Sequence, residues 1–503
     1  MLILFMLLGG ALLTKHEMWR DEFQVWNLAR ASNSLSEMLA NKRYEGHPDG
    51  WYLVVYPFAK TFRAPQAIQV LNFGIAIGYV SVFLLFAPFP WWQRVLFPFG
   101  YFALFEYGTI ARMYGMGVLM VVLFLTLRRQ GPKHLLGCVA AVAWLAETSV
   151  FGMILSVVLF GAYAIELALD HRASVESGWV RFKIGVGCSV WGLAAGLAVL
   201  RMVPPADNGY AQEWFFRWIP GRAVLALANV WKALVPIPPF RRTFWGYMGA
   251  DNLITSARTQ AVLGVVLLVL VVVVLFDRPF ALATFLAGAV GCLGFAYAKD
   301  FGFPRHYGHL FVVLLAALWI AAEIDARCPE VGAQWRRTLR SGLTAGVLGC
   351  QLAAAIPAVV LEWRFPFSSA KEAAQVVTRV GGPSVRVVSD RDWSGVSIAG
   401  WLGRDVAFPR TGRSGSFVVW DAAWADANKE NWDSVWSDIN QRKIDGVVAS
   451  GVRLHQDTHA PVFLVLDYPL DLGRYAGSVE KVAATAPAIV PDESYFVYAV
   501  VAR

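Results

Sequence analysis

The sequence predicts a polytopic α-helical membrane protein that carries a small α/β domain at its C-terminal end. Hydrophobic residues make up 57% of the 503 residues. Charged residues make up 16%, well below the roughly 25% that is usual in soluble domains. Long apolar segments recur up to residue 361, and shorter apolar runs alternate with helical patterns from residue 362 onward. We therefore expect a transmembrane domain, 1–361, followed by a domain outside the membrane, 362–503.

About eleven segments of the first part are candidates for membrane-spanning helices, because a helix needs roughly 17 to 25 apolar residues to cross a bilayer. Several are short and need flanking Trp, Tyr or Arg side chains to complete the crossing. The first lacks a basic start and a small-residue cleavage site, so we expect a retained anchor and not a signal peptide. The candidates are 1–14, 66–87, 93–110, 113–127, 135–146, 150–169, 184–203, 261–276, 281–298, 310–322 and 342–361.

Basic residues predict the orientation. Most Lys and Arg residues of the short loops become cytoplasmic if the N-terminus is cytoplasmic, as the positive-inside rule requires. These loops are 128–133, 170–183, 277–279 and 323–340. We expect a bacterial inner-membrane protein whose C-terminal domain is extracytoplasmic. The same side receives a first large loop, 15–65, a second, 201–260, and a short one, 299–309.

Charge and cysteine usage exclude some classes of function. The net charge of +8 belongs to the membrane part, where it indicates the positive-inside bias and anion handling, not nucleic-acid binding. The five cysteines fall in predicted helices or, for Cys328, in a loop expected on the cytoplasmic side. Disulfides and thiolate metal sites are therefore not indicated in the external segments.

Short apolar runs in the last 140 or so residues predict an α/β domain. We expect strands at 384–389, 416–420, 446–449 and 495–500, with helices at 371–380 and 432–441. This domain is expected to recognise an acceptor or partner, or to cap the membrane part. Its Trp393, Trp401, Arg404 and Trp420 are candidates for stacking on sugar rings, although Trp residues in such a domain are more often core.

The candidates for chemistry begin in the first loop. Asp21 and Glu22 follow the first apolar segment, and ionised groups at a membrane surface usually indicate function. Taken alone, the pair is more often a solvated helix cap. The same loop contains His47-Pro48, which alone is more often a turn, and it leads through Trp51 and Tyr52 into an apolar run.

Two further groups of polar residues are expected on the same face. Glu106 lies in an apolar run and needs a partner, for which Arg112 is the nearest local candidate; a purely structural Glu106–Arg112 pair is the alternative. The loop 299–309 contains Arg305 and His306, and such groups suit a lipid phosphate. Interfacial snorkelling is the alternative for any one of them.

These motifs resemble the GT-C glycosyltransferases, especially the protein mannosyltransferase and aminoarabinose transferase branch. The resemblance rests on a short first helix, the Asp-Glu pair, a His-Pro-x-x-Trp-Tyr-Leu entry and a Glu-Tyr-x-x-x-Ala-Arg-x-Tyr turn. It covers roughly the first 130 residues well and the hydropathy of the next 230 loosely. His47-Pro48-Asp49 departs from the usual second proline, which leaves the role of Asp49 open.

The resemblance implies inverting transfer of a sugar from a polyprenyl-phosphate carrier to a lipid, glycan or protein acceptor on the external face. Asp21 would be the base that deprotonates the acceptor, with Glu22 orienting it and Glu106 as a third catalytic residue. Cations would stabilise the lipid-phosphate leaving group. The donor-phosphate candidates are Arg112, Tyr114, Arg305 and His306, and the substrate-binding candidates are His47, Trp51 and Tyr52.

Metal dependence is left open by the sequence. No Asp-x-Asp motif occurs in the first loop, and the residues that would hold a divalent ion are Asp21, Glu106 and His47.

Two other classes of function are weighed against the transferase. A transporter of a lipid-linked or anionic substrate is disfavoured because no repeat relates the two halves. A non-catalytic envelope assembly protein would use the external domain as a binding module. Aromatic residues of 201–260 predict interfacial helices bordering the carrier's entrance.

Overall fold

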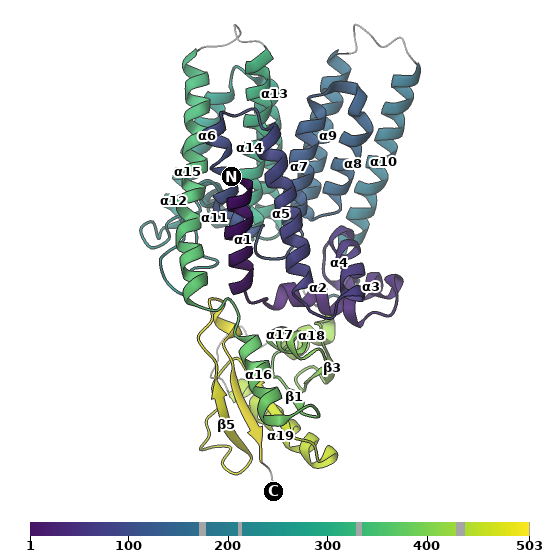
Figure 1. Cartoon of the computed structure of the whole chain (residues 1–503), viewed down its shortest axis with the longest axis vertical. Helices are drawn as coiled ribbons and strands as arrows, with labels where there is room; N and C mark the ends of the chain where they lie inside the picture. Colours follow the sequence, from purple (N-terminus) through teal and green to yellow (C-terminus); the bar gives the residue numbers. More distant parts are fainter. Residues whose placement is uncertain (171–177, 210–213, 328–333, 429–437, 502–503) are drawn as a thin grey trace.

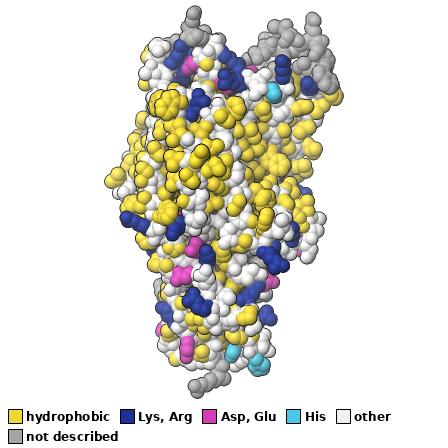
Figure 2. Space-filling view, viewed as in Figure 1, with side chains coloured by type: hydrophobic (Ala, Val, Ile, Leu, Met, Phe, Trp, Pro, Cys, Tyr) yellow, Lys and Arg dark blue, Asp and Glu magenta, His cyan; other side chains and the backbone are white. Residues whose placement is uncertain are grey.

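The computed structural model describes residues 1–170, 178–209, 214–327, 334–428 and 438–501. Long helices lie side by side in a bundle, and a domain built on a sheet lies at one end of it (Figure 1). A broad apolar band covers the middle of the bundle, with most Lys and Arg side chains above and below it (Figure 2). This arrangement confirms the predicted fold class, an integral membrane protein with a C-terminal α/β domain.

Among the described residues, seven helices are long and apolar enough to cross a membrane. An eighth span results if α1 (Leu2–Lys15) and α2 (Arg20–Ala31), which meet at an angle of 82°, are counted as one broken span. Two shorter apolar helices, α7 (Tyr114–Arg128) and α8 (Leu135–Ala146), join the bundle. The expected number of eleven spans is therefore not established by the described residues. The seven are α5 (Ala67–Phe86), α9 (Val150–Asp170), α10 (Gly178–Met202), α12 (Ala257–Leu275), α13 (Pro279–Ala298), α14 (Pro304–Arg327) and α15 (Gln334–Arg364).

The predicted span 93–110 is wrong. Its residues form α6 (Trp91–Arg94), a 3₁₀ turn (Phe97–Phe99) and a π-helical turn (Tyr101–Glu106). Pro98 has no backbone N–H to continue a helix, and Gly100 takes an extended conformation at φ −72° and ψ 154°. The side chain of Asn72 then holds the following loop by donating to the carbonyls of Tyr107, Gly108 and Ile110. The chain thus reaches Arg112 through a fixed loop.

The second large loop contains one helix, α11 (Pro220–Leu234), which packs against α12, α13 and α14. Several aromatic side chains before it are exposed, among them Trp214, Phe216 and Trp218 at 54%, 83% and 74%. Their exposure fits the expected position at a membrane interface.

Helix α14 ends and helix α15 begins at the end of the bundle away from the C-terminal domain (Figure 1). Buried ion pairs join the helices there. Arg128 contacts both Glu166 and Glu323 at 2.7 and 2.8 Å, and Arg340 contacts Asp277 and Asp325 at 2.7 and 2.9 Å. These pairs fix the helix register at that end, so the basic residues have a structural function as well as a topological one.

The C-terminal domain contains a six-stranded sheet in the order β3-β2-β1-β4-β6-β5. Strands β2, β1 and β4 are parallel, and the other pairings are antiparallel. The strands are β1 (Arg386–Val388), β2 (Val406–Phe408), β3 (Arg413–Gly415), β4 (Val462–Leu466), β5 (Val479–Ala484) and β6 (Phe496–Val500). The helices are α16 (Ala370–Gly381), α17 (Asp392–Leu402), α18 (Ala422–Asn428) and α19 (Asp438–Thr458).

The predicted elements of this domain are confirmed in part. The strands at 384–389 and 495–500 and the helix at 371–380 correspond to β1, β6 and α16. The strand at 446–449 is wrong, because these residues belong to α19, where Val447 and Val448 face the core. The predicted helix 432–441 lies largely outside the described residues.

The strand predicted at 416–420 is also wrong. The backbone of this segment is hydrogen-bonded to a side chain of α2 and not to a neighbouring strand. The Val418 N–H donates to the Gln24 side-chain oxygen at 2.9 Å, and the Gln24 amide donates back to the Val418 carbonyl at 2.8 Å. A segment whose backbone N–H and C=O groups are hydrogen-bonded to a distant side chain needs no neighbouring strand.

Helix α2 packs directly on the C-terminal domain. Phe23 meets Trp401 of α17 with ring centroids 5.3 Å apart, and a Cβ on Gly400 would lie 2.0 Å from the Phe23 ring. The Asn27 amide donates to the carbonyls of Val396 and Ser416. Helix α2 therefore belongs as much to the sheet domain as to the bundle.

Asp392, the first residue of α17, makes stability depend on pH. Burial raises the pKa of Asp392 to about 6, although Trp424 and Trp393 donate hydrogen bonds to it. The native state then binds more protons than the unfolded chain between pH 4 and 6, so its stability falls as pH rises through this window. At about 1.4 kcal/mol per pKa unit, the loss approaches about 3 kcal/mol.

We predict that Asp392→Asn removes this loss, because an amide oxygen still accepts from Trp424. Unfolding midpoints of the purified protein at pH 4.5 and pH 8 measure the effect. The variant should match the wild type at low pH and exceed it at pH 8. Asp426→Asn, a change at an exposed residue of α18, is the control. An equal gain at both pH values would contradict the prediction.

Candidate functional site

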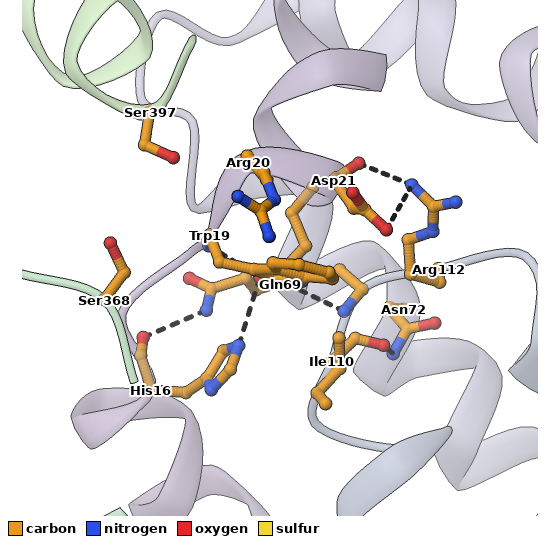
Figure 3. A network of polar contacts seen from close by, with 12 residues as sticks. His16, Trp19, Arg20, Asp21, Gln69, Asn72, Ile110, Arg112, Ser368 and Ser397 are labelled. Carbon is orange, nitrogen blue, oxygen red and sulfur yellow. Dashed lines mark hydrogen bonds and ion pairs between the residues drawn. The ribbon is translucent and has the colours of Figure 1, made fainter. Parts of the chain in front are cut away.

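Asp21 lies in the first turn of α2, just after the bend from α1. Its carboxylate is 3.2 Å from Arg305 and 3.8 Å from Arg112, and Arg112 also donates to the Asp21 carbonyl at 2.7 Å. Figure 3 shows Arg112 turned toward Asp21. Burial alone would raise the pKa of Asp21, but the Arg112 and Arg305 guanidiniums outweigh it and hold this pKa below its usual value. Three expected site residues thus meet, as the sequence predicts.

Glu22 faces the interior. It accepts hydrogen bonds from the N–H groups of Trp19 and Ala111 at 3.1 and 2.8 Å and contacts His16 Nε2 at 3.1 Å. His16 Nδ1 lies 2.9 Å from Glu362 of α15. Both contacts are satisfied when each His16 ring nitrogen carries a proton. Since all three side chains are fully buried, Glu22 fixes the turn that presents Asp21, which agrees with an orienting role.

Glu106 does not pair with Arg112, so the structural-pair alternative is wrong. Glu106 Oε2 accepts from Tyr101 at 2.7 Å and from the Trp245 indole at 3.1 Å, while its Oε1 is buried without a hydrogen-bond partner. The Trp245 ring also lies 5.5 Å from the Arg305 guanidinium. Glu106 is therefore linked to Arg305 through Trp245.

Arg305 and His306 occupy the first turn of α14. Arg305 lies over the rings of Trp19 and Trp245 at 5.5 Å each. His306 Nδ1 accepts from the Phe303 N–H at 3.0 Å, so its Nε2 carries the proton and donates to the Tyr114 hydroxyl at 3.0 Å. All four predicted phosphate-binding residues are thus brought to one region, from α7, α14 and the loop before α7.

The His47 loop closes the site from a third side, between the 3₁₀ turn Lys42–Tyr44 and α4 (Gly50–Thr61). Burial, with Arg112 and Lys42 nearby, lowers the pKa of His47 to about 3, so His47 is neutral. Lys42 donates to the His47 carbonyl and contacts Asp49 at 2.6 Å, and Asp49 also pairs with Arg201 at 3.1 Å. The sequence left the role of Asp49 open. In the structure, its ion pairs with Lys42 and Arg201 hold the His47 loop in place.

Trp51 and Tyr52 differ in what they can contact. Both are fully buried. The Trp51 indole N–H is buried without a partner, whereas the Tyr52 hydroxyl reaches Glu45 at 3.4 Å. Tyr52 is therefore connected to the site, and Trp51 belongs to the core behind it.

Glu45 is a site residue that the sequence analysis missed. Its Oε1 accepts from Gln24 at 2.7 Å and from the Trp420 indole of the C-terminal domain at 3.2 Å. Burial raises the pKa of Glu45, while Gln24 and Arg112 oppose the increase. Its position two residues before His47-Pro48, in a loop already selected for its carboxylates, was the available signal.

The described residues contain no group of three or more His, Cys, Asp or Glu side chains arranged to hold a metal ion. Asp21 is engaged by arginines, and Glu106 is engaged by Tyr101 and Trp245. The donor set that the sequence offered for a divalent ion is therefore not assembled.

Comparison with known proteins gives structural matches only. No protein-family model matches the sequence, and no curated protein matches it. The chain aligns with the crystal structure of ArnT from Cupriavidus metallidurans bound to undecaprenyl phosphate at 12% identity and a TM-score of 0.46, covering 99% of this chain and 97% of that chain. The apo structure of ArnT aligns at 13% identity and a TM-score of 0.43 over the same shares.

We predict that Glu22→Ala lowers the stability of the folded protein more than Asp21→Asn does. Truncating Glu22 leaves the Ala111 N–H without its acceptor and His16 without one of its two carboxylates. Breaking a buried pair in this way costs about 3 to 5 kcal/mol. Asp21 is partly exposed, at 26% of its side chain, so its amide variant should lower the unfolding midpoint by less than Glu22→Ala does. Equal midpoints for both variants would contradict this difference.

Proposed function

We propose that this protein is a membrane glycosyltransferase of the GT-C type, which moves a sugar from a polyprenyl-phosphate donor to a hydroxyl acceptor. One observation carries the proposal. A carboxylate and two guanidiniums, Asp21 with Arg112 and Arg305, meet where the helical bundle joins the C-terminal domain. A base for the acceptor and cations for a phosphate leaving group are the two requirements of this reaction.

Arg112 and Arg305 share one anionic partner, Asp21. The donor phosphate supplies a second anion for these two guanidiniums. Arginine matches phosphate oxygens in forked geometry, and Tyr114 with His306 lies beside it as a further hydrogen-bonding pair. Once the phosphate takes the guanidiniums, Asp21 loses its strongest charge partners. Its pKa then rises, because opposite charges nearby favour the ionised form. Donor binding thereby makes Asp21 a better proton acceptor.

The transfer is a single displacement. Asp21 takes the proton of the acceptor hydroxyl as that oxygen forms its bond to the anomeric carbon. The bond from this carbon to the phosphate oxygen breaks, and the electron pair leaves with the lipid phosphate, where Arg112 and Arg305 stabilise the charge. Attack opposite the leaving group inverts the anomeric centre. His47 and Tyr52 border the same space and belong to the proposed substrate contacts.

Two further residues act by positioning. Glu22 fixes the turn before α2, and Glu106 holds the Trp245 indole, whose ring lies beside Arg305. We expect both to act through their neighbours and not to contact the reacting atoms.

The proposed location is a bacterial inner membrane, with the N-terminus in the cytoplasm and the sheet domain outside. Helix α14 ends and helix α15 begins at the end of the bundle away from that domain (Figure 1), and both carry Arg residues there, as the positive-inside rule requires of a cytoplasmic end. The reaction would then occur on the extracytoplasmic face, between a carrier in the bilayer and an acceptor of lipid, glycan or protein nature.

The central test is transfer by the purified protein from a panel of radiolabelled polyprenyl-phosphate sugars to lipid, glycan and protein fractions. Asp21→Asn should lower the rate by about 10² to 10⁴ through loss of the base. Glu37→Gln, a change in a carboxylate that caps the neighbouring α3 (Leu35–Asn41), should keep the wild-type rate. No transfer from any donor by folded protein would favour the transporter or assembly alternatives.

The pH dependence of the rate separates Asp21 from Glu45 as the base. kcat/KM reports the ionisation of the free enzyme, so it falls as pH decreases through the pKa of the base. This pKa is lowered for Asp21 and raised for Glu45. We predict a kcat/KM that is constant from pH 5 to 7 and stays so in Glu45→Gln. A decrease below pH 6 that disappears in Glu45→Gln would assign the proton transfer to Glu45.

A further inference from the structure

Three cations are exposed beside the C-terminal domain, at the end of the helical bundle. Lys15 is the last residue of α1, Arg364 is the last residue of α15, and Arg241 lies in the second large loop. All three side chains lie over aromatic rings that are themselves exposed. The distances to the ring centroids are 5.2 Å for Lys15 over Trp363, 5.8 Å for Arg364 over Phe240 and 4.4 Å for Arg241 over Tyr247.

These contacts join the three cations into one surface, which we call the basic patch (Lys15, Arg241 and Arg364). The ring under Lys15, Trp363, directly precedes Arg364 in the chain. The ring under Arg364, Phe240, directly precedes Arg241. A ring face holds a cation by electrostatic attraction, and stacking leaves the N–H groups at the edge of a guanidinium able to donate. The patch therefore keeps its hydrogen-bond donors available to a ligand.

The positive charge of the basic patch is not neutralised within the described part of the chain. No ion pair there joins any of its three side chains to a carboxylate. Glu362, two residues before Arg364, is buried and contacts His16 instead. Other arginines of the external segments, Arg20 and Arg201, do have carboxylate partners. Three neighbouring positive charges without a counter-ion attract an anion from outside the protein.

The basic patch lies at an edge of the apolar band. Helices α1 and α15 pack against each other and both end next to the C-terminal domain (Figure 1), where Lys and Arg side chains follow the edge of the band (Figure 2). Eight residues before Lys15 and Arg364, the same helices expose Leu7 at 66% and Ile356 at 60%. This spacing corresponds to roughly 12 Å along a helix. Apolar surface is therefore within reach of any lipid whose head group contacts the patch.

An anionic phospholipid matches both parts of this surface. Its phosphate accepts charge-assisted hydrogen bonds from guanidinium and ammonium groups, and its acyl chains cover the exposed apolar side chains of α1 and α15. Exposed tryptophan beside basic residues is typical of the level at which lipid head groups lie. A zwitterionic phospholipid fits less well, because its own ammonium group opposes the three cations of the patch.

We propose that the basic patch is a binding site for the head group of an anionic phospholipid. The site is separate from the buried Arg112 and Arg305, which are assigned to the donor phosphate. Lys15 adjoins His16, and Arg364 lies two residues after Glu362, so a phosphate between these two cations braces the helix ends that the His16–Glu362 contact joins. Binding therefore stabilises the junction of α1 with α15.

Native mass spectrometry of the purified full-length protein measures which lipid is retained from mixed micelles of phosphatidylglycerol or phosphatidylethanolamine. The wild type should retain phosphatidylglycerol at least about tenfold better, and Arg364→Gln should reduce this preference by about fivefold, because each basic residue beside an anionic membrane surface contributes about that factor. Combining Lys15→Gln, Arg241→Gln and Arg364→Gln should abolish it. Arg63→Gln, a change at an exposed cation between α4 and α5, is the matched control and should keep the preference.

Unfolding midpoints provide the second measurement. Phosphatidylglycerol should raise the midpoint of the wild type and of Arg63→Gln, since a ligand that binds only the native state stabilises it. It should not raise the midpoint of the triple variant. The three substituted residues are exposed, so the triple variant should match the wild type in phosphatidylethanolamine, which verifies that it folds.

Five outcomes would overturn the proposal. Three are equal retention of the two lipids by the wild type, a preference that survives in the triple variant, and an equal loss in Arg63→Gln. The other two are displacement of phosphatidylglycerol by inorganic phosphate, which would identify a site for free anions, and displacement by polyprenyl phosphate, which would assign the patch to the donor. Sugar transfer without this lipid preference would remove only this inference, and the preference without transfer would remove only the proposed function.

Discussion

The contact between Glu22 and the Ala111 N–H holds the candidate site together. Asp21 is the residue before Glu22, and Arg112 is the residue after Ala111. One buried hydrogen bond of 2.8 Å therefore brings the proposed base and one of its cations to the same place, from α2 and from the loop before α7. His16 and Glu362 extend this contact to α15. Removing three ionisable groups from water is expensive, and the site depends on their mutual compensation.

Helix α2 transmits this arrangement to the sheet domain. Its start is fixed by the bundle, and its later residues, Phe23, Gln24 and Asn27, contact the C-terminal domain. The first residue of the helix is held by the same domain, since the Arg20 N–H donates to Glu493 at 2.8 Å and its guanidinium contacts Asp492. A displacement of the sheet domain would therefore move Asp21. The domain is part of the site's scaffold and not a detached module.

The sequence predicted those features that depend on local composition. Apolar length located the long helices, and three residues that the sequence selected, Asp21, Arg112 and Arg305, lie close together. The failures occurred where a distant partner decides the structure. The predicted span at 93–110 was wrong because the helix is broken at Pro98 and Gly100 and Asn72 holds the loop that follows. The predicted strand at 416–420 was wrong because the Gln24 side chain takes the place of a neighbouring strand. Glu45 was missed although it lies two residues before His47, because its contact with Trp420 joins segments that are far apart in sequence.

The charge distribution at Asp21 explains why the proposed donor is a lipid phosphate. Arg112 and Arg305 exceed Asp21 by one positive charge, and His47 remains neutral among them. The surplus is largely removed from water, since the two arginine side chains are only 7% and 11% exposed, and a desolvated cation binds an anion more strongly than an exposed one. An apolar band adjoins this end of the bundle (Figure 2). A ligand that satisfies both neighbours has an anionic head and a long apolar tail. A soluble nucleotide sugar would satisfy the charge but leave the apolar surface unused, so the membrane-bound donor is the better fit.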